Sequence, residues 1–161
     1  MGGFSTGFSW GFQRGNYSAT KFRFEAEGTY IPGDETRGTM KRKRVNVVEG
    51  STVVTMGRLR DVAGVHVTVG SVEELSAIMV NETTDESVAV TEATINNCLF
   101  PTMQTDVRWK EDSIGYNFAI VIDGNYFADG DTPYRLEVTI KTTGQPAFKE
   151  FWTYQTLQMK D

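Results

Sequence analysis

Asp106-Val-Arg-Trp-Lys-Glu-Asp-Ser-Ile-Gly-Tyr-Asn-Phe118 is the stretch of this chain that says most about its fold. Its pattern predicts a strand that carries Trp109, a tight corner from Asp112 to Gly115, and a return strand that begins at Tyr116. Glycine suits such a corner because it adopts positive φ without a steric penalty. Large apolar residues at alternating positions, punctuated by Gly and Asp, are typical of the core strands of a β-sandwich.

Alternating stretches of the same kind lie on both sides of this corner. In chain order, the other expected strands are residues 21–31, 45–48, 52–59, 65–69, 75–80, 87–95, 116–123, 134–142 and 147–157. Turn residues separate them, for example Pro32-Gly33-Asp34 and Asn96-Asn97. Strands that recur every 8–12 residues or so indicate a sandwich or barrel. We therefore expect an all-β sandwich of about seven to nine strands.

The corner favours an immunoglobulin-like sandwich. In such domains a Tyr near the start of a strand hydrogen-bonds back across a corner. Asp112 and Tyr116 are separated in this sequence by about the length of such a corner, and Gly115 lies between them. The single cysteine, Cys98, excludes an intrachain disulfide, so this would be an immunoglobulin-like fold without the usual bridge. Two large apolar residues follow Cys98, which is therefore expected to be a buried, inert thiol.

Residues 1–20 differ in composition from the rest of the chain, because they repeat Gly-Phe-Ser at intervals of four. Gly and Ser form helices poorly, and proteins rarely leave several aromatic side chains idle in solvent. Either this arm folds back onto its own domain, or it docks on another subunit through Phe4, Phe8, Trp10 and Phe12. We favour docking. The chain then divides into a partner-docking N-terminal arm with one strand, residues 1–44, and an antiparallel immunoglobulin-like β-sandwich, residues 45–161.

Composition limits the classes of partner. The chain has 161 residues and a net charge of −5, which argues against a general nucleic-acid or anionic-membrane surface. The one basic run, residues 40–44, is read as a solvated surface or as a partner for acidic groups on a neighbour, with nucleic-acid binding or localisation as the alternative. The sequence has neither an apolar run of about 20 residues nor a secretory signal, so we expect synthesis and assembly in a cytoplasm.

Convergent catalytic groups are not evident in the sequence. The lone His66, in Val-His-Val, is read as a strand residue that packs or faces solvent, and it has no second histidine with which to form a metal site beside Cys98. There is no nucleophile elbow and no phosphate-binding loop. We therefore expect no enzyme activity, no catalytic residues and no cofactor.

Two further stretches leave alternatives open. Asp123, Asn125, Asp129 and Asp131 could gather around Ca²⁺, but their spacing does not match the twelve-residue calcium loop, and Asp-Gly is ordinary hairpin chemistry. Exposed Trp and Tyr side chains could form a sugar-stacking platform. Trp109 and Trp152 both lie in alternating stretches, however, so a place in the core is the favoured interpretation. No metal site is therefore expected.

Three passages resemble those of tailed-phage virion proteins. Glu49-Gly-Ser-Thr52, followed by Arg58-Leu-Arg-Asp61 and Gly64-Val65, is similar to the opening of the immunoglobulin-like N-terminal domains of baseplate and accessory proteins, including the upper baseplate protein family. The stretch from Asp106 to Phe118, with residues 134–138 and Gly144, resembles the second half of small phage structural proteins. Residues 3–8 resemble the Gly/Phe/Ser start of short virion proteins.

The resemblance implies a non-enzymatic building block and no catalytic residues. The expected function is that of an adaptor or attachment protein at the tail, neck or baseplate of a virion, assembled in the host cytoplasm. Its partners would be other virion proteins (tail, neck, portal-proximal or major capsid protein), with multiple copies in a symmetric assembly and neither nucleic acid nor membrane. Capsid decoration (a cement protein) and a carbohydrate-binding module of a receptor-binding device are the alternatives.

Overall fold

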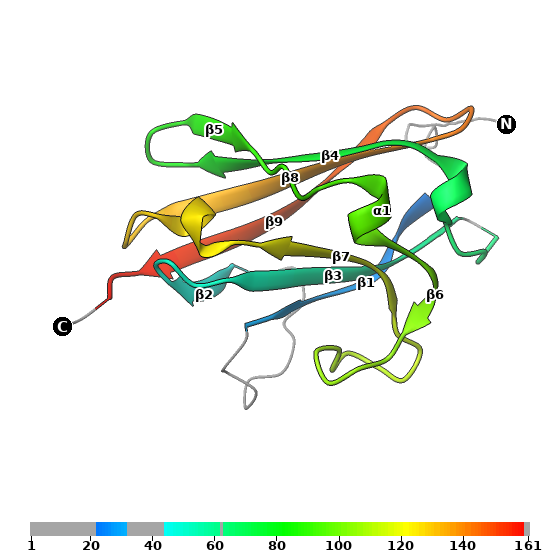
Figure 1. Ribbon diagram of the computed structural model, residues 1–161, viewed down its shortest axis with the longest axis horizontal. Helices are drawn as coiled ribbons and strands as arrows, with labels where there is room; N and C mark the ends of the chain where they lie inside the picture. Colours follow the sequence, from blue (N-terminus) through cyan, green and yellow to red (C-terminus); the bar gives the residue numbers. More distant parts are fainter. Residues whose placement is uncertain (1–21, 32–43, 62, 160–161) are drawn as a thin grey trace, which may run out of the picture.

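The computed structural model describes residues 22–31, 44–61 and 63–159, which form an all-β sandwich (Figure 1). Its strands are β1 (Phe22–Tyr30), β2 (Val45–Val48), β3 (Val53–Asp61), β4 (Val72–Asn81), β5 (Glu86–Ala89), β6 (Leu99–Gln104), β7 (Tyr116–Ile122), β8 (Pro133–Thr142) and β9 (Phe148–Leu157). Three short helices connect them: η2 (Val69–Ser71), α1 (Ile95–Cys98) and η3 (Gly124–Phe127).

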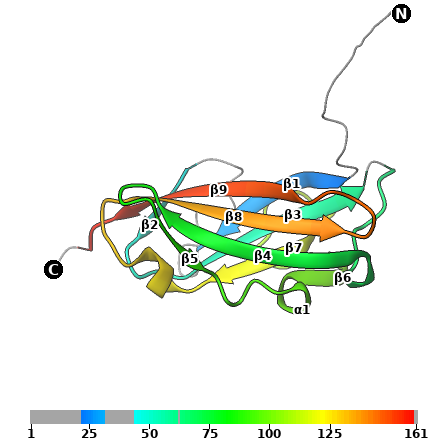
Figure 2. The same cartoon turned by 90° about the horizontal axis from the view of Figure 1, so that it is seen from above.

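The strands form two layers, and in Figure 2 the sheet with β9, β8 and β4 lies in front of the sheet with β1, β3 and β7. One sheet has the order β1-β3-β7-β6, and the other has the order β2-β9-β8-β4-β5. All paired strands in these sheets are antiparallel except β2 and β9, which run parallel. β1, which the sequence analysis grouped with the arm, pairs with β3 along most of its length. The prediction of an all-β sandwich is confirmed.

Alternation of buried and less buried residues is clearest in β8 and β9, whereas β3 and β7 are buried over most of their length. In β8 every second residue from Tyr134 to Thr142 is buried, as expected for a strand with one face on a core. The expected strands at residues 21–31, 45–48, 52–59, 75–80, 116–123, 134–142 and 147–157 correspond to β1, β2, β3, β4, β7, β8 and β9. Hydrophobic periodicity was therefore a good guide wherever a full sheet face is buried.

The main core lies between the two sheets and is rich in aromatic residues. Phe118 of β7 stacks on Trp152 of β9 with ring centroids 6.0 Å apart. Phe24 of β1 meets both rings edge-on, at 5.2 and 5.4 Å. Gly57 makes room for Phe24, since a Cβ at this glycine would lie 2.4 Å from the phenylalanine ring. Trp152 is thus a core residue, as predicted.

A second, smaller cluster covers the outer face of the β1-β3-β7-β6 sheet. Its buried members are Val54, Met56, Trp109, Tyr116 and Ala119. Trp109 is only 5% exposed, so the prediction that it is a core residue is correct. It reaches this cluster from the loop between β6 and β7, which folds over the sheet.

Three strand predictions are wrong or too long. Trp109 lies in the β6–β7 loop and not in a strand, because backbone N–H groups there bond to local Asp side chains instead of to a neighbouring strand. Residues 65–69 contribute only an isolated bridge between His66 and Arg60. The strand expected at 87–95 stops at Ala89, and the chain then turns into α1.

The helices of the described residues are all short, and none has the length and apolar character of a membrane-spanning segment.

Candidate functional site

The predicted corner is held to the sheet by a buried arginine. Arg58 of β3 is 4% exposed and donates through both terminal nitrogens to the Asp112 carboxylate, at 3.0 and 2.9 Å. Its Nε donates to Glu25 of β1 at 2.8 Å, and Nη1 also donates to the Gly115 carbonyl. A buried guanidinium needs such complete pairing, so this arrangement is a structural clamp on the β6–β7 loop.

Asp112 is the residue that shapes the corner. Besides Arg58, it accepts hydrogen bonds from the Trp109 indole at 2.9 Å and from the backbone N–H of Ile114 and Gly115. The Arg58 guanidinium and these donors hold the pKa of Asp112 well below its usual range. Gly115 has φ +106, and a Cβ there would lie 2.4 Å from the Gln104 carbonyl oxygen. The expected glycine corner is therefore present.

Tyr116 departs from the predicted corner in its hydrogen bond. Its hydroxyl donates to the Asp106 carboxylate at 2.6 Å and accepts from Arg108, so it does not reach Asp112. Burial, followed by the Asp106 carboxylate, raises the pKa of Tyr116 to about 12. The side-chain partner lies ten residues upstream because the whole loop, and not only its tip, folds back over the sheet. Trp109, Asp112, Gly115 and Tyr116 thus act together, as scaffold.

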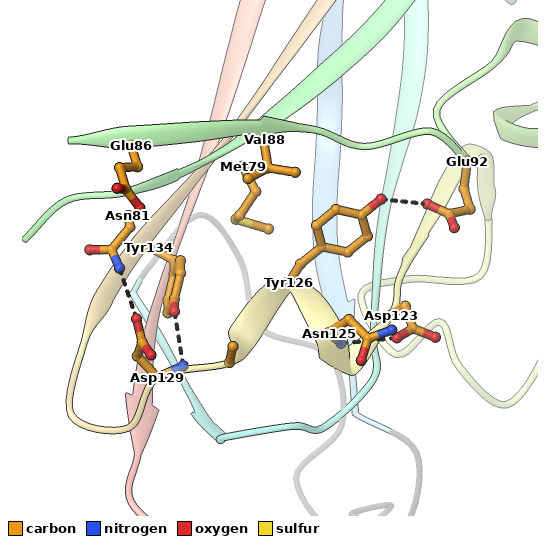
Figure 3. A pocket seen from close by; sticks show the side chains of 11 residues that line it. Met79, Asn81, Glu86, Val88, Glu92, Asp123, Asn125, Tyr126, Asp129 and Tyr134 are labelled. Atoms are coloured by element: carbon orange, nitrogen blue, oxygen red, sulfur yellow. Dashed lines mark hydrogen bonds between the residues drawn. The ribbon is translucent and has the colours of Figure 1, made fainter. Parts of the chain in front are cut away.

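A cleft of about 480 Å³ lies at the opposite end of the sandwich. It opens between the β4–β5 hairpin and the segment that contains η3, and Figure 3 shows the side chains that line it. Met79, Val88, Ala128 and the rings of Tyr126 and Tyr134 give it an apolar floor. Two segments about 40 residues apart in the sequence therefore form one concave surface.

Four carboxylates surround this apolar floor. They are those of Glu86, Glu92, Asp123 and Asp129, and all four residues are exposed. Among the eleven described residues that line the cleft there is no Lys, Arg or His. No salt bridge between described residues includes any of the four carboxylates. The cleft thus carries an acidic rim without a basic partner from the described part of the chain.

Hydrogen bonds within the lining fix its shape. The Tyr126 hydroxyl donates to Glu92 at 3.1 Å, which joins η3 to the segment after β5 (Figure 3). The Asn81 amide donates to Asp129 at 3.3 Å, and the Asp129 N–H donates to the Tyr134 hydroxyl at 3.1 Å. These bonds connect the hairpin to the η3 segment at both ends of the cleft. The concavity is therefore preformed.

The loop considered for calcium forms one wall of this cleft. Asp123 caps η3 by accepting from the Asn125 N–H at 2.9 Å, and the Asp129 carboxylate turns toward Asn81. Asp131 has φ +52 and is not among the lining residues. No three His, Cys, Asp or Glu side chains in the described ranges gather closely enough to share a metal ion. The carboxylates serve as a helix cap and as rim groups.

The remaining predicted residues fall outside this cleft. Cys98 is 1% exposed, and burial raises the pKa of its thiol to about 11, as expected for an inert cysteine. His66 lines a separate cleft of about 470 Å³ with Asp61 and Ser71. The proposed anchors Phe4, Phe8, Trp10 and Phe12 lie outside the described residues.

The cleft is not evident in the sequence, because its two walls are far apart along the chain. The sequence predicts only a polar turn at residues 83–86, and it places Glu92 in the strand expected at residues 87–95. The signal that could have found the site is the pair of acid-rich turns, at residues 81–92 and 123–131, each next to a strand of the same sheet. Their proximity follows from the antiparallel pairing of β4 with β8.

Comparisons with known proteins do not assign this chain to a family: no family model, no curated protein and no solved structure matches it.

Proposed function

We propose that this protein is a non-enzymatic structural component of a tailed-phage virion, acting as an adaptor at the tail, neck or baseplate. Capsid decoration is the alternative position. The observation that supports the proposal is the two-sheet sandwich, in which the described residues bury an apolar core of their own between the sheets. In this proposal that core does not draw on residues 1–20, and the aromatic side chains of the arm are left to a partner.

The arm would bind through several anchors at once. Burying one Phe or Trp side chain contributes roughly 1.5–3 kcal/mol before ordering costs. Fixing a glycine-rich backbone opposes this by about 1–2 kcal/mol per residue, so single anchors are too weak. Phe4, Phe8, Trp10 and Phe12 together, repeated over the copies of a symmetric assembly, would overcome that cost by avidity.

The rival function, a carbohydrate-binding module, predicts a platform of exposed aromatic rings. Trp109 and Trp152 are 5% and 3% exposed, and neither is available as a stacking surface. In the acidic cleft, the Tyr126 hydroxyl is already engaged by Glu92. These observations favour a structural role. A glycan array probed with the full chain tests the rival, which predicts binding that survives loss of the arm.

Deleting residues 1–20 tests the adaptor proposal. The truncated chain should keep the thermal unfolding transition of the full chain but should no longer co-purify with the assembled particle. As a matched control, a full-length variant with Phe4, Phe8, Trp10 and Phe12 all changed to Ser keeps the length of the arm and removes its anchors. It should fail in the same way. If the deletion unfolds the sandwich, or if both variants still join the particle, the adaptor proposal is wrong.

A further inference from the structure

The acidic cleft has the lining that a long cationic side chain needs. Lys and Arg combine an apolar stem with a charged head, and they bind best where the stem lies on apolar surface and the head meets carboxylates. Here the floor includes Met79 and Val88, and the rim carries Glu92 and Asp123. The floor has room for such stems because the cavity holds about 480 Å³.

The chain itself contains one segment of the complementary charge. Lys41, Arg42, Lys43 and Arg44 form its only run of basic residues. Arg44, the last of them, pairs with Glu82 at 3.3 Å and donates to the Tyr154 carbonyl at 3.2 Å. The end of the basic run is therefore attached to the sandwich beside β9.

The position of Arg44 argues against insertion into its own cleft. Glu82, its partner, also pairs at 2.8 Å with Arg135, which lies on the outer face of β8, between the inward-facing Tyr134 and Leu136. Met79 and Tyr134, in the floor of the cleft, belong to the core on the inner side of the same sheet. Arg44 is thus attached at the outer face of the sheet and the cleft lies on the inner side, which favours a second copy of the chain as the source of the basic segment.

We infer that the cleft binds the basic segment of residues 41–43 from a second copy of this chain. The inference rests on the proposed function in one respect, the assembly of several copies of the chain. It adds the identity of the two surfaces through which those copies would bind one another. A contact of this kind, between one surface and a different surface, is heterologous and generates a ring or a stack of copies. Because the carboxylates of the cleft are exposed, the contact weakens as salt rises.

Charge reversal at the two surfaces tests the inference by sedimentation velocity on the full chain, at several protein and salt concentrations. One variant carries Lys41→Glu, Arg42→Glu and Lys43→Glu. The other carries Glu86→Lys and Glu92→Lys. Each alone should weaken self-association by roughly tenfold or more at low salt, because like charges then face each other. The control, Glu73→Lys with Glu74→Lys at the far end of β4, makes the same charge change and should associate like the wild type.

Mixing the two variants provides the decisive result. The reversed segment of the first then faces the reversed cleft of the second, and association should return as complexes that contain both. The inference is overturned if the wild type is monomeric at every concentration, if single variants associate normally, or if the mixture stays dissociated. Loss of partner binding on deleting residues 1–20 would leave these outcomes unchanged, so this test and the test of the adaptor proposal fail separately.

Discussion

The two ends of the sandwich use similar residues in opposite ways. The corner between β6 and β7 and the cleft beside η3 both combine Asp, Gly and aromatic side chains. At the corner, the Asp112 carboxylate is paired with the buried guanidinium of Arg58 at 2.9 Å. At the cleft, Asp123 and Glu92 are exposed and take part in no salt bridge with a described residue.

This difference separates scaffold from binding surface. A charge withdrawn from water must be fully paired, and once it is paired it has little left to offer a ligand. Exposed carboxylates around an apolar floor are still hydrated and can exchange water for a cationic group. Carboxylate density alone therefore does not indicate a site. What distinguishes a binding surface from scaffold is whether the countercharge is already supplied by the protein itself.

Arg58→Ala should cause the largest loss of stability. Removing the guanidinium leaves Glu25 and Asp112 without their shared partner and frees the β6–β7 loop. Because removing one partner of a buried ion pair costs about 3–5 kcal/mol, we expect a loss of that size. Urea denaturation followed by tryptophan fluorescence measures this loss, since the Trp109 indole donates to Asp112, the partner of Arg58. The control is Arg60→Ala, which removes a 24% exposed side chain and should cost about 1 kcal/mol or less. Equal losses for the two variants would contradict the clamp.

Gly115→Ala should follow at about 2–4 kcal/mol, because the new methyl group combines an unfavourable backbone conformation with a collision against Gln104. Gly144→Ala is the matched control. It has φ +76 but nothing within 4 Å of the added Cβ, so only the backbone term of about 1–2 kcal/mol remains. Thermal unfolding of both variants measures the difference. A Gly144 variant as unstable as the Gly115 variant would mean that the close approach to Gln104 is irrelevant.

Asp112→Asn should cost about 1.5–3 kcal/mol at neutral pH, the range for a hydrogen bond to a charged group. The pKa of Asp112 is lower in the folded protein than in the unfolded chain, where it is near 3.9. Its contribution is therefore present above that unfolded value and is lost as pH falls through the folded pKa. Urea midpoints of the variant and the wild type, measured from pH 7 down to pH 2, should stay apart above about pH 4 and draw closer below it. If the difference between the two urea midpoints did not change with pH, the loss of stability in acid would have to come from groups other than Asp112.

Much of the fold could be predicted because its signals are local. The alternation from Tyr134 to Thr142 is complete within one strand, and that strand was found. Trp109 was correctly assigned to a core but wrongly to a strand. The error arose because its indole and the nearby backbone bond to Asp112, and Asp112 in turn depends on Arg58, 54 residues away. No window of the sequence around Trp109 contains that arginine.

The candidate site was harder to predict than the fold for the same reason. Tyr126 and Glu92 meet only because β4 and β8 are neighbours in a sheet, and 34 residues separate them in the chain. The sequence shows the carboxylates of residues 123–131, and it allows calcium as their partner while predicting no metal site. What it could not supply was the opposite wall, with Met79 and Val88, which turns a row of acids into a cleft with an apolar floor.

Asp123→Asn should have the smallest effect, although it is the same chemical change as Asp112→Asn. Asn caps a helix about as well as Asp, so the bond from the Asn125 N–H is retained. Removing one of four neighbouring negative charges also relieves repulsion, so the free energy of unfolding should change by no more than about 0.5 kcal/mol. Urea denaturation at pH 7 measures the free energy of unfolding of the Asp112→Asn and Asp123→Asn variants under the same conditions. If Asp123→Asn proved as costly as Asp112→Asn, the cleft carboxylates would have to be structural, and the contrast between the two ends of the molecule would not hold.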